Sequence, residues 1–447
     1  MYRDRFRFLS EIDRELHEIH PGRDNALLLT SLLLWRVMSQ RLDHPVFGFE
    51  SFREMISRDN MGERFYQCLV SFEANAPEMF GGIFSSLEAY FGELCIKGGF
   101  WPWALDVLGK YAHKDMFAEP KAVNDYFVEI LNLSFSGKNR DANFLSPEVC
   151  RMAAALLNPS DDERVRCIGC GYGLPFLSCY EKNPRIKLDG LDCAASSEIQ
   201  TRINLLLFGN NPRINTEDIV SESPASREAD IILARPVPGL WSGEILDLRN
   251  DRLDRFGGLI EKKAVDEIVV MAHALKMMDR KKGRAAFFLP RSFLSGYQTR
   301  KIRAHILNSG LLEAVLTVPR DKSPGSPGKE ALIILNAAKR GRRVVLADGD
   351  GLYSEKDVYA DVDETADAVG GGTKNDFCFP VSVPEIKDRG YSLNIEAYRE
   401  PAGFSEKEFK RLGMELKSIN AELPSLQKRL NAKLAALGWR MPENGQD

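Results

Sequence analysis

A long cation follows an apolar run in the stretch ADIILARPVPGLW, residues 229–241. Residues 231–233 have the continuous apolar pattern of a strand that is covered on both faces. Pro236 and Pro238 cannot donate to a sheet ladder, so we expect the strand to end at Arg235. Ligands bind at the carboxyl ends of strands in open α/β sheets, which makes Arg235 a candidate functional residue. Its guanidinium would offer hydrogen-bond donors and a permanent positive charge, but no acceptor.

A glycine-rich turn follows an earlier apolar run, RVRCI at 164–168. Its three glycines are Gly169, Gly171 and Gly173. Glycines there let the backbone approach a bound nucleoside or phosphate closely, although alone they are an unspecific signal. About twenty residues further on, Asp192 ends the run KLDGLD, where a carboxylate can accept hydrogen bonds from ribose hydroxyls. Asp218 follows the next run.

Two cysteines, Cys167 and Cys170, form a CxxC motif that suits either a zinc site or a pair of buried thiols. No second CxxC or His pair completes a zinc ligand set, and Cys167 falls in an expected strand. Buried thiols are therefore the favoured interpretation. The stretch LHEIH, with His17 and His20, does not match the zincin pattern HExxH and fits a solvated helix face.

Positive charge is concentrated in one part of the chain, although the net charge is only −4. Residues 271–345 hold sixteen Lys and Arg against four Asp and Glu, so the remainder is clearly acidic. Solvated loops would explain part of this, and we prefer that explanation for KRGRR. For the rest, a one-sided charge field favours a phosphate-rich partner such as DNA. The candidate nucleic-acid-binding residues are Arg280, Lys281, Lys282, Arg284, Arg291, Arg300 and Arg303.

Length and composition indicate a multidomain chain without a membrane segment. The 447 residues exceed one ordinary domain, and 44% hydrophobic content is enough for a sizeable core. No apolar stretch approaches the roughly 18 residues of a membrane span, and the charged start does not resemble a signal peptide. We therefore expect a soluble, cytoplasmic protein whose eight cysteines are reduced thiols.

Short apolar runs alternate with helix-length amphipathic stretches from about 140 to 350, whereas residues 1 to about 135 show only helical spacing. The alternation predicts an α/β fold with a doubly wound, mostly parallel sheet. The expected strands are RVRCI, KLDGLD, RINT, DIILA, RAAFFL, LLEAVLTV, ALIILN and RRVVLA. The expected helices are 146–157, 194–207, 263–279 and 297–309. Only AAKRGR separates the last two strands, which is too short for a helical crossover, so we expect them to pair antiparallel.

A helical tail follows a Gly-rich, acidic linker at about 349–375. Apolar residues in the tail repeat at alternating intervals of four and three, which is typical of a coiled-coil seam. They are Leu412, Leu416, Ile419, Leu423, Leu426 and Leu430. Pro424 interrupts this pattern, so we expect either a kink or two helices that meet there. A seam this short favours docking on the chain itself or on a partner.

The order of these motifs resembles the adenine-N6 DNA methyltransferase subunit of type I restriction-modification systems. NFLSPEVCRMAAALLNP is similar to the family's F-x-[TS]-P-x-x-V element, and VRCIGCGYG stands in the place of D-P-x-C-G-S-G. GLD and INLLLFG are similar to G-x-[ED] and N-x-x-x-x-G. KKGRAAFFLPRSFLS, KIRAHILNSGLLEAVLTVP and ALIILN follow in the family's order, and so does GYSLNIEAYRE, which is similar to Y-x-L-N-[IL]-x-x-Y. The resemblance is clearest from about 140 to 400.

The resemblance implies a class I S-adenosylmethionine-dependent methyltransferase fold, with an antiparallel last strand, preceded by an all-helical domain. The implied domains are a helical domain at 1–138, the methyltransferase-like domain at 139–350, a linker and C-terminal extension at 351–400, and a coiled-coil-like tail at 401–447. The implied cofactor-binding residues are Phe144, Pro147, Gly169, Gly171, Gly173, Asp192 and Asp218. The implied partners are DNA and a specificity subunit or other restriction-modification or defence subunits, bound through the tail.

The chain departs from the family where the chemistry is. The family's signature after the fourth strand is N-P-P-[FY], and the four positions here are Arg235, Pro236, Val237 and Pro238. In the family, the Asn and the first Pro carbonyl accept hydrogen bonds from the adenine amino group while the ring stacks on the flipped base. Arginine cannot accept, and the ring is missing, although Trp241 follows closely. The family's Asp-Pro before the glycines is Cys167-Ile168, so one acidic cofactor contact is lost.

These departures leave two hypotheses for Arg235 and two for the protein. Arg235 is either a tolerated surface residue or a cation that faces a DNA phosphate or plugs the empty pocket. The protein is expected to be a catalytically impaired, methyltransferase-like subunit that binds DNA or partners in a restriction or defence complex. No catalytic residue would then be intact, and binding of S-adenosylmethionine is in doubt. The alternative is an active adenine-N6 DNA methyltransferase with a rebuilt site.

Overall fold

Two compact units make up the chain, Met1–Ile395 and Glu396–Asp447. The structure is a computed structural model. It describes residues 5–19, 25–42, 48–54, 61–94, 100–118, 121–135, 145, 147–191, 195–211, 213–216, 218–219, 228–236, 241, 248, 250–251, 254–260, 265–318, 330–339, 341, 343–349, 362–371, 377–399 and 406–436. None of the described helices combines the length and hydropathy that a membrane crossing requires.

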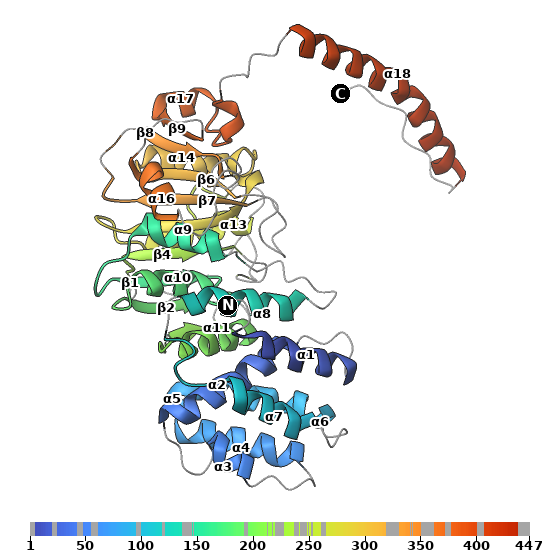
Figure 1. The fold of residues 1–447 in the computed structure, drawn as a ribbon. Helices are drawn as coiled ribbons and strands as arrows, with labels where there is room; N and C mark the ends of the chain where they lie inside the picture. Colours follow the sequence, from blue (N-terminus) through green and yellow to red (C-terminus); the bar gives the residue numbers. More distant parts are fainter. Residues whose placement is uncertain are drawn as a thin grey trace. The chain divides into compact units, whose positions relative to one another are not determined.

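Helices fill the amino-terminal region, as the sequence predicts (Figure 1). They are α1 (Arg7–Ile19), α2 (Ala26–Leu42), α3 (Phe49–Glu54), α4 (Met61–Asn75), α5 (Pro77–Phe80), α6 (Glu88–Leu94), α7 (Phe100–Tyr111) and α8 (Lys121–Phe135). Helix α2 is apolar on nearly all sides, and this is the pattern of a helix surrounded by others. Its Trp35 packs against the rings of Phe49 and Phe65, with centroids 5.2 Å away in both cases.

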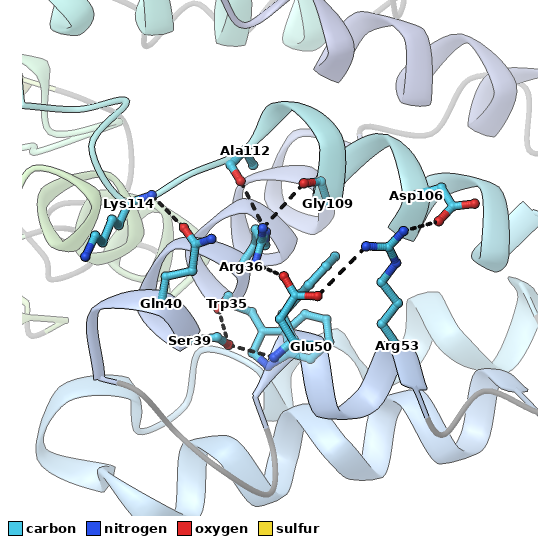
Figure 2. A network of polar contacts seen from close by, with 11 residues as sticks. Trp35, Arg36, Ser39, Gln40, Glu50, Arg53, Asp106, Gly109, Ala112 and Lys114 are labelled. Atoms are coloured by element: carbon cyan, nitrogen blue, oxygen red, sulfur yellow. Dashed lines mark hydrogen bonds and ion pairs between the residues drawn. The ribbon is translucent and has the colours of Figure 1, made fainter.

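A buried arginine ties three of these helices together. Arg36 of α2 is 4% exposed, and its guanidinium lies 2.7 Å from the Glu50 carboxylate of α3 (Figure 2). It also donates to the carbonyls of Gly109 and Ala112 at the end of α7. Burial lowers the pKa of Arg36, and the charge of Glu50 opposes that shift. Glu50 and the two carbonyls therefore give the buried guanidinium of Arg36 the hydrogen-bond partners that it requires.

Nine strands form one mixed sheet in the order β3-β2-β1-β4-β5-β7-β6-β8-β9, visible as a stack in Figure 1. They are β1 (Arg164–Ile168), β2 (Lys187–Leu191), β3 (Arg213–Asn215), β4 (Ile231–Ala234), β5 (Arg284–Pro290), β6 (Leu312–Thr317), β7 (Glu330–Asn336), β8 (Arg343–Ala347) and β9 (Cys378–Ser382). The eight expected strands are thus confirmed. The ninth contains Pro380 and lies at the sheet's edge, where proline is tolerated.

The expected pairing of ALIILN with RRVVLA is wrong. β7 pairs antiparallel with β5 on one side and with β6 on the other, so both of its edges are occupied. β8 instead pairs parallel with β6 and antiparallel with β9. The connection after β7 therefore crosses the start of β6, and the Lys339 ammonium there donates to the carbonyls of Leu312 and Arg343. The short connection between β7 and β8 is sufficient because it passes only one strand, β6.

Helices cover the sheet in the doubly wound manner that the alternation predicts. They are α9 (Pro147–Leu157), α10 (Leu174–Lys182), α11 (Ala195–Leu207), α13 (Asp266–Met277) and α14 (Arg300–Asn308). Alternate strand residues such as Cys167 and Leu233 join the core that includes α9 and α10, whereas α13 contacts β4. Within the expected linker at 349–375, the structure has helix α16 (Val362–Gly371), which packs on α9.

Helix α11 joins the amino-terminal helices to the sheet. Gln200 of α11 donates to Thr30 of α2 at 3.1 Å, and Tyr126 of α8 donates to Asn204 of α11 at 2.8 Å. Arg41 of α2 donates to the carbonyls of Leu206 and Leu207 at the end of the same helix. These bonds lie within the first compact unit. The expected domain boundary near residue 138 lies outside the described residues and stays a prediction.

The second unit contains α18 (Glu406–Ala436), one helix that runs through Pro424. The alternative of two helices meeting at Pro424 is therefore wrong. The apolar seam is exposed within this unit, with Leu416, Ile419, Leu423, Leu426 and Leu430 each 51–62% accessible.

We expect Gly190→Ala to destabilise the sheet, because a Cβ at this position of β2 would lie 2.7 Å from Cys170 Sγ and 2.7 Å from Ile214 Cδ1. Such overpacking costs about 1–3 kcal/mol. The midpoint of urea denaturation, followed by circular dichroism, measures the loss. Gly341→Ala is the control, since a Cβ there meets nothing within 4 Å. Equal midpoints for the two variants would contradict the packing argument.

Candidate functional site

The candidate site lies at the edge of the sheet where β1, β2, β4 and β5 end, which we call the carboxyl edge. The glycine turn after β1 is part of it. Gly169, Gly171 and Gly173 all have positive φ, at 74°, 55° and 78°, a conformation that other residues rarely adopt. Gly169 N donates to Leu191 O at the end of β2, at 2.8 Å. The turn thus lies next to the ends of β1 and β2, and its residues are buried or half-buried.

Polar side chains of α11 hold this turn, which the sequence analysis did not foresee. Thr201 Oγ1 donates to Gly171 O at 2.6 Å, and Asn204 Nδ2 donates to Tyr172 O at 2.8 Å. Asn204 Oδ1 in turn accepts from Tyr126 and Gln200. The turn is therefore connected through α11 to helices α2 and α8. The stretch INLLLFG carried a signal for this role, because Asn204 stands at the Asn of the family's N-x-x-x-x-G.

The position of the family's acidic cofactor contact offers no carboxylate. Cys167 is 1% exposed and packs in the core. Cys170 Sγ donates to the backbone carbonyls of Cys167 and Leu191 instead of facing a ligand. Among the described residues, no group of three or more His, Cys, Asp or Glu is arranged to hold a metal ion.

The other expected cofactor residues are only partly described. Pro147 is the buried first residue of α9, and Asp218 is half-buried after β3. Phe144 and Asp192 lie outside the described residues.

Arg235 is buried at the carboxyl edge and forms an ion pair. It directly follows β4, and its side chain is 8% exposed. Its Nη2 donates to Glu330 Oε1 at 2.8 Å, and the Glu330 side chain is 11% exposed. Burial raises the pKa of Glu330, while the charge of Arg235 and this hydrogen bond oppose the rise. The hypothesis that Arg235 is a tolerated surface residue is therefore wrong.

The antiparallel insertion of β7 brings Glu330 to this position. Because β7 runs against β5, its first residue, Glu330, lies opposite Pro290 at the end of β5. This partner was not predicted from the sequence, because β7 was expected to pair with β8.

The next motif positions are less informative. Pro236 is half-buried, Val237 and Pro238 lie outside the described residues, and Trp241 donates through Nε1 to Asp266 Oδ1 at 2.8 Å.

Four of the candidate nucleic-acid-binding residues lie at the opposite, amino edge of the sheet. Arg280, Lys281 and Lys282 are exposed in the turn before β5, and Arg284 begins that strand. Lys282 pairs with Asp230 at 2.8 Å, and this hydrogen bond raises the pKa of Lys282. Arg284 pairs with Glu163 at 2.6 Å and lines a cavity of about 480 Å³ between α9, β6, β7 and α16. The fold therefore places these four residues away from the carboxyl edge.

The other three candidates follow β5 at the carboxyl edge, but only Arg300 is exposed. Arg291 donates to the carbonyls of Val318 and Glu330. Arg303 is 2% exposed and donates to the carbonyls of Phe293, Gly296 and Tyr391. The expectation that Arg303 lies on an exposed basic face is therefore wrong. The sequence of this amphipathic helix did not distinguish Arg303 from an exposed arginine.

Replacing Arg235 alone should destabilise the protein, because the Glu330 carboxylate would remain buried without its partner. Breaking a buried ion pair from one side costs about 3–5 kcal/mol. We expect Arg235→Met to lower the urea midpoint accordingly, and the double variant Arg235→Met with Glu330→Leu to recover most of the loss. A double variant as unstable as Arg235→Met would contradict the pairing.

The same variants should differ in their dependence on pH. A carboxyl whose pKa is raised by folding contributes stability at low pH, and this contribution is lost as pH rises through the folded-state pKa. Arg235→Met removes the charge that opposes the rise in the pKa of Glu330, so the stability deficit of this variant should grow as pH rises above the ordinary range of a carboxyl group. The double variant lacks the carboxyl and should not show this growth.

Solved structures with the same fold include methyltransferase subunits of type I restriction-modification systems. The subunit from Streptococcus thermophilus superposes with a TM-score of 0.72 at 16% identity, covering 89% of this chain and 99% of that one. A modification subunit of a putative type I restriction enzyme from Vibrio vulnificus gives 0.62 at 14% identity, covering 85% and 93%. The class I methyltransferase fold with a preceding helical region is thereby confirmed.

Comparison of the sequence with known families identifies the family of this chain. The methylase subunit of a type I restriction enzyme from Methanocaldococcus jannaschii is 23% identical over 313 residues, which cover 62% of this chain. The matched part spans 53% of that relative. The family model described as N-6 DNA methylase matches residues 124–407, more than half of the chain. The chain therefore belongs to the N-6 DNA methylase family.

Proposed function

We propose that this protein is a type I restriction-modification methyltransferase-like subunit that is catalytically impaired and acts as a DNA- or partner-binding component of its complex. The observation that carries the proposal is the buried Arg235–Glu330 ion pair at the place of the family's N-P-P-[FY] motif. The family relationship supplies the class of complex. At the amino edge, Lys282 and Arg284 form ion pairs, and Arg280 and Lys281 are exposed.

Adenine N6 methylation needs hydrogen-bond acceptors beside the amino group, since they raise the electron density on N6 as it attacks the methyl group. A guanidinium has donors only. Its charge would also oppose the positive charge that develops on N6 in the transition state. At Arg235 this cation is already bound to Glu330, so the position of the family's Asn holds a paired donor in place of an acceptor. The replacement of the family's Asn by Arg235 therefore supports a loss of catalysis.

The described residues fit S-adenosylmethionine only in part. The glycine turn keeps three glycines with positive φ, and α11 fixes it. At the other end, Cys167 cannot make the charge-assisted hydrogen bonds of a carboxylate. The loss of this contact supports weak binding of S-adenosylmethionine.

The retained glycine turn favours a second candidate, an active adenine-N6 DNA methyltransferase with a divergent site. Three positive-φ glycines are expensive to keep in a turn without a function, because the unfolded chain gains entropy from each. In this candidate, the carbonyl of Pro236, which keeps the family's first Pro, would accept from the adenine amino group. Activity of the unmodified protein separates the two candidates.

We expect the unmodified protein to incorporate no tritiated methyl groups into adenine-rich duplex DNA above background, with its specificity subunit present. Isothermal titration should likewise show binding of S-adenosylmethionine that is weaker than micromolar, since the acidic contact is missing. Arg235→Asn with Glu330→Gln removes the ion pair without leaving a buried charge. It should also be inactive, because groups that act together on one transition state do not contribute additively.

An active member of the family, assayed in parallel, is the positive control. Clear turnover by the unmodified protein would overturn the proposal and establish the divergent enzyme. Turnover by Arg235→Asn with Glu330→Gln alone would show that the ion pair is the only block.

We further propose that α18 binds a helix of the specificity subunit or another subunit of the complex. Its apolar seam repeats at alternating four and three residues and is exposed in its own unit. A 31-residue helix with such a seam is stabilised by pairing with another helix. One of the structures with this fold belongs to a study of complex assembly in the type I restriction-modification system, with a TM-score of 0.60.

Leu423→Glu with Leu426→Glu should abolish binding to the coexpressed specificity subunit. Losing burial of two leucines, each contributing about 1.5–3 kcal/mol, weakens association by roughly 100-fold or more. Copurification measures the effect. Lys428→Glu is the matched control, since it changes the net charge equally but lies off the seam. Undiminished binding of the double variant would exclude the seam as the interface.

A further inference from the structure

One aromatic side chain at the carboxyl edge is held in solvent. Tyr297 lies in the loop between β5 and α14 and is 79% exposed, more than any other large hydrophobic side chain that the described residues include. Single exposed aromatics are common on protein surfaces and by themselves indicate nothing. What distinguishes Tyr297 is the construction of its loop, its position and its surrounding charge.

Buried hydrogen bonds fix the backbone around Tyr297. Arg303 Nη1 donates to Phe293 O at 2.6 Å and to Gly296 O at 2.9 Å. Thr299 Oγ1, also buried, donates to Phe293 O at 2.9 Å. The backbone closes the same loop, since Gly296 N donates to Ser292 O at 2.8 Å. A buried guanidinium thus serves to hold a loop whose outermost side chain is a ring.

The loop belongs to the edge that carries Arg235. Pro290, at the end of β5, is paired with Glu330, whose carboxylate binds Arg235. Arg291 begins the loop and donates to Glu330 O at 3.3 Å. Arg303 Nε donates to Tyr391 O, which brings the segment around Tyr391 against the same loop. The loop that carries Tyr297 therefore begins at the same edge of the sheet as Arg235.

The chain segment that forms the loop carries positive charge only, which suits a polyanion. No Asp or Glu occurs between Asp279 and Glu313. Arg300 and Lys301 are exposed directly after the loop, and the Arg300 guanidinium lies 5.9 Å from the centre of the Tyr391 ring. Proteins that bind unpaired nucleotides combine such cations with aromatic rings on which bases stack.

We propose that Tyr297 is a stacking platform for an unpaired base of DNA bound at the carboxyl edge, with Arg300 contacting the backbone phosphate. This rests on the proposed DNA-binding function and adds the residue that receives the base. In the family, the ring of N-P-P-[FY] stacks on the base, and here Pro238 stands at that position. Tyr297 offers a ring from a different strand end of the same edge.

The test uses the full chain and a fluorescein-labelled duplex with one unpaired adenine. Tyr297→Ala should weaken binding roughly 5- to 150-fold, the range of one base–aromatic stack, without changing the salt dependence. Tyr297→Phe should bind as the unmodified protein does, because it keeps the ring. Arg300→Gln should instead lower the slope of log affinity against log salt by about one. Tyr111→Ala removes another exposed tyrosine, in α7, and should have no effect.

A second readout replaces the unpaired adenine with 2-aminopurine. Its emission should be quenched by stacking on the unmodified protein and on Tyr297→Phe, but not on Tyr297→Ala. Equal affinity and equal quenching for Tyr297→Ala would overturn the platform while leaving DNA binding intact. Absence of DNA binding by the unmodified protein would overturn the DNA-binding role and the platform together.

Discussion

The buried ion pair between Arg235 and Glu330 organises the carboxyl edge. A guanidinium at the end of a central strand must be neutralised once it is buried, because an unpaired charge in the interior is strongly destabilising. The insertion of β7 between β5 and β6 supplies the carboxylate. Glu330 also accepts a hydrogen bond from Arg291 through its backbone carbonyl. The ends of β4 and β5 and the start of β7 therefore meet at Glu330.

A second set of contacts relates the helical region to this edge. Asn204 receives hydrogen bonds from Tyr126 and Gln200 and donates to the glycine turn through Tyr172 O. The amino-terminal helices therefore take part in shaping the turn and do more than flank the sheet. These contacts fix the turn beside Cys167, which occupies the position of the family's carboxylate.

Positive charge in residues 271–345 is divided by the fold between two edges. At the amino edge, ion pairs with Asp230 and Glu163 engage Lys282 and Arg284. At the carboxyl edge, Arg291 and Arg303 hold backbone carbonyls, and Arg300 is exposed. A count of cations along the sequence thus overstates the charge that a DNA backbone would meet. The fold leaves few cations of this edge in solvent.

The sequence by itself determined the elements, because apolar periodicity is a local property. The runs RVRCI and RAAFFL predicted β1 and β5 nearly to the residue, and the glycines after β1 predicted the turn. The tertiary structure alone decided which strands pair, since pairing depends on which edges remain free after other strands have docked. That choice placed Glu330 beside Arg235, and helix packing turned Arg303 inward. Apolar spacing cannot reveal either contact, because each joins residues that are far apart in the chain.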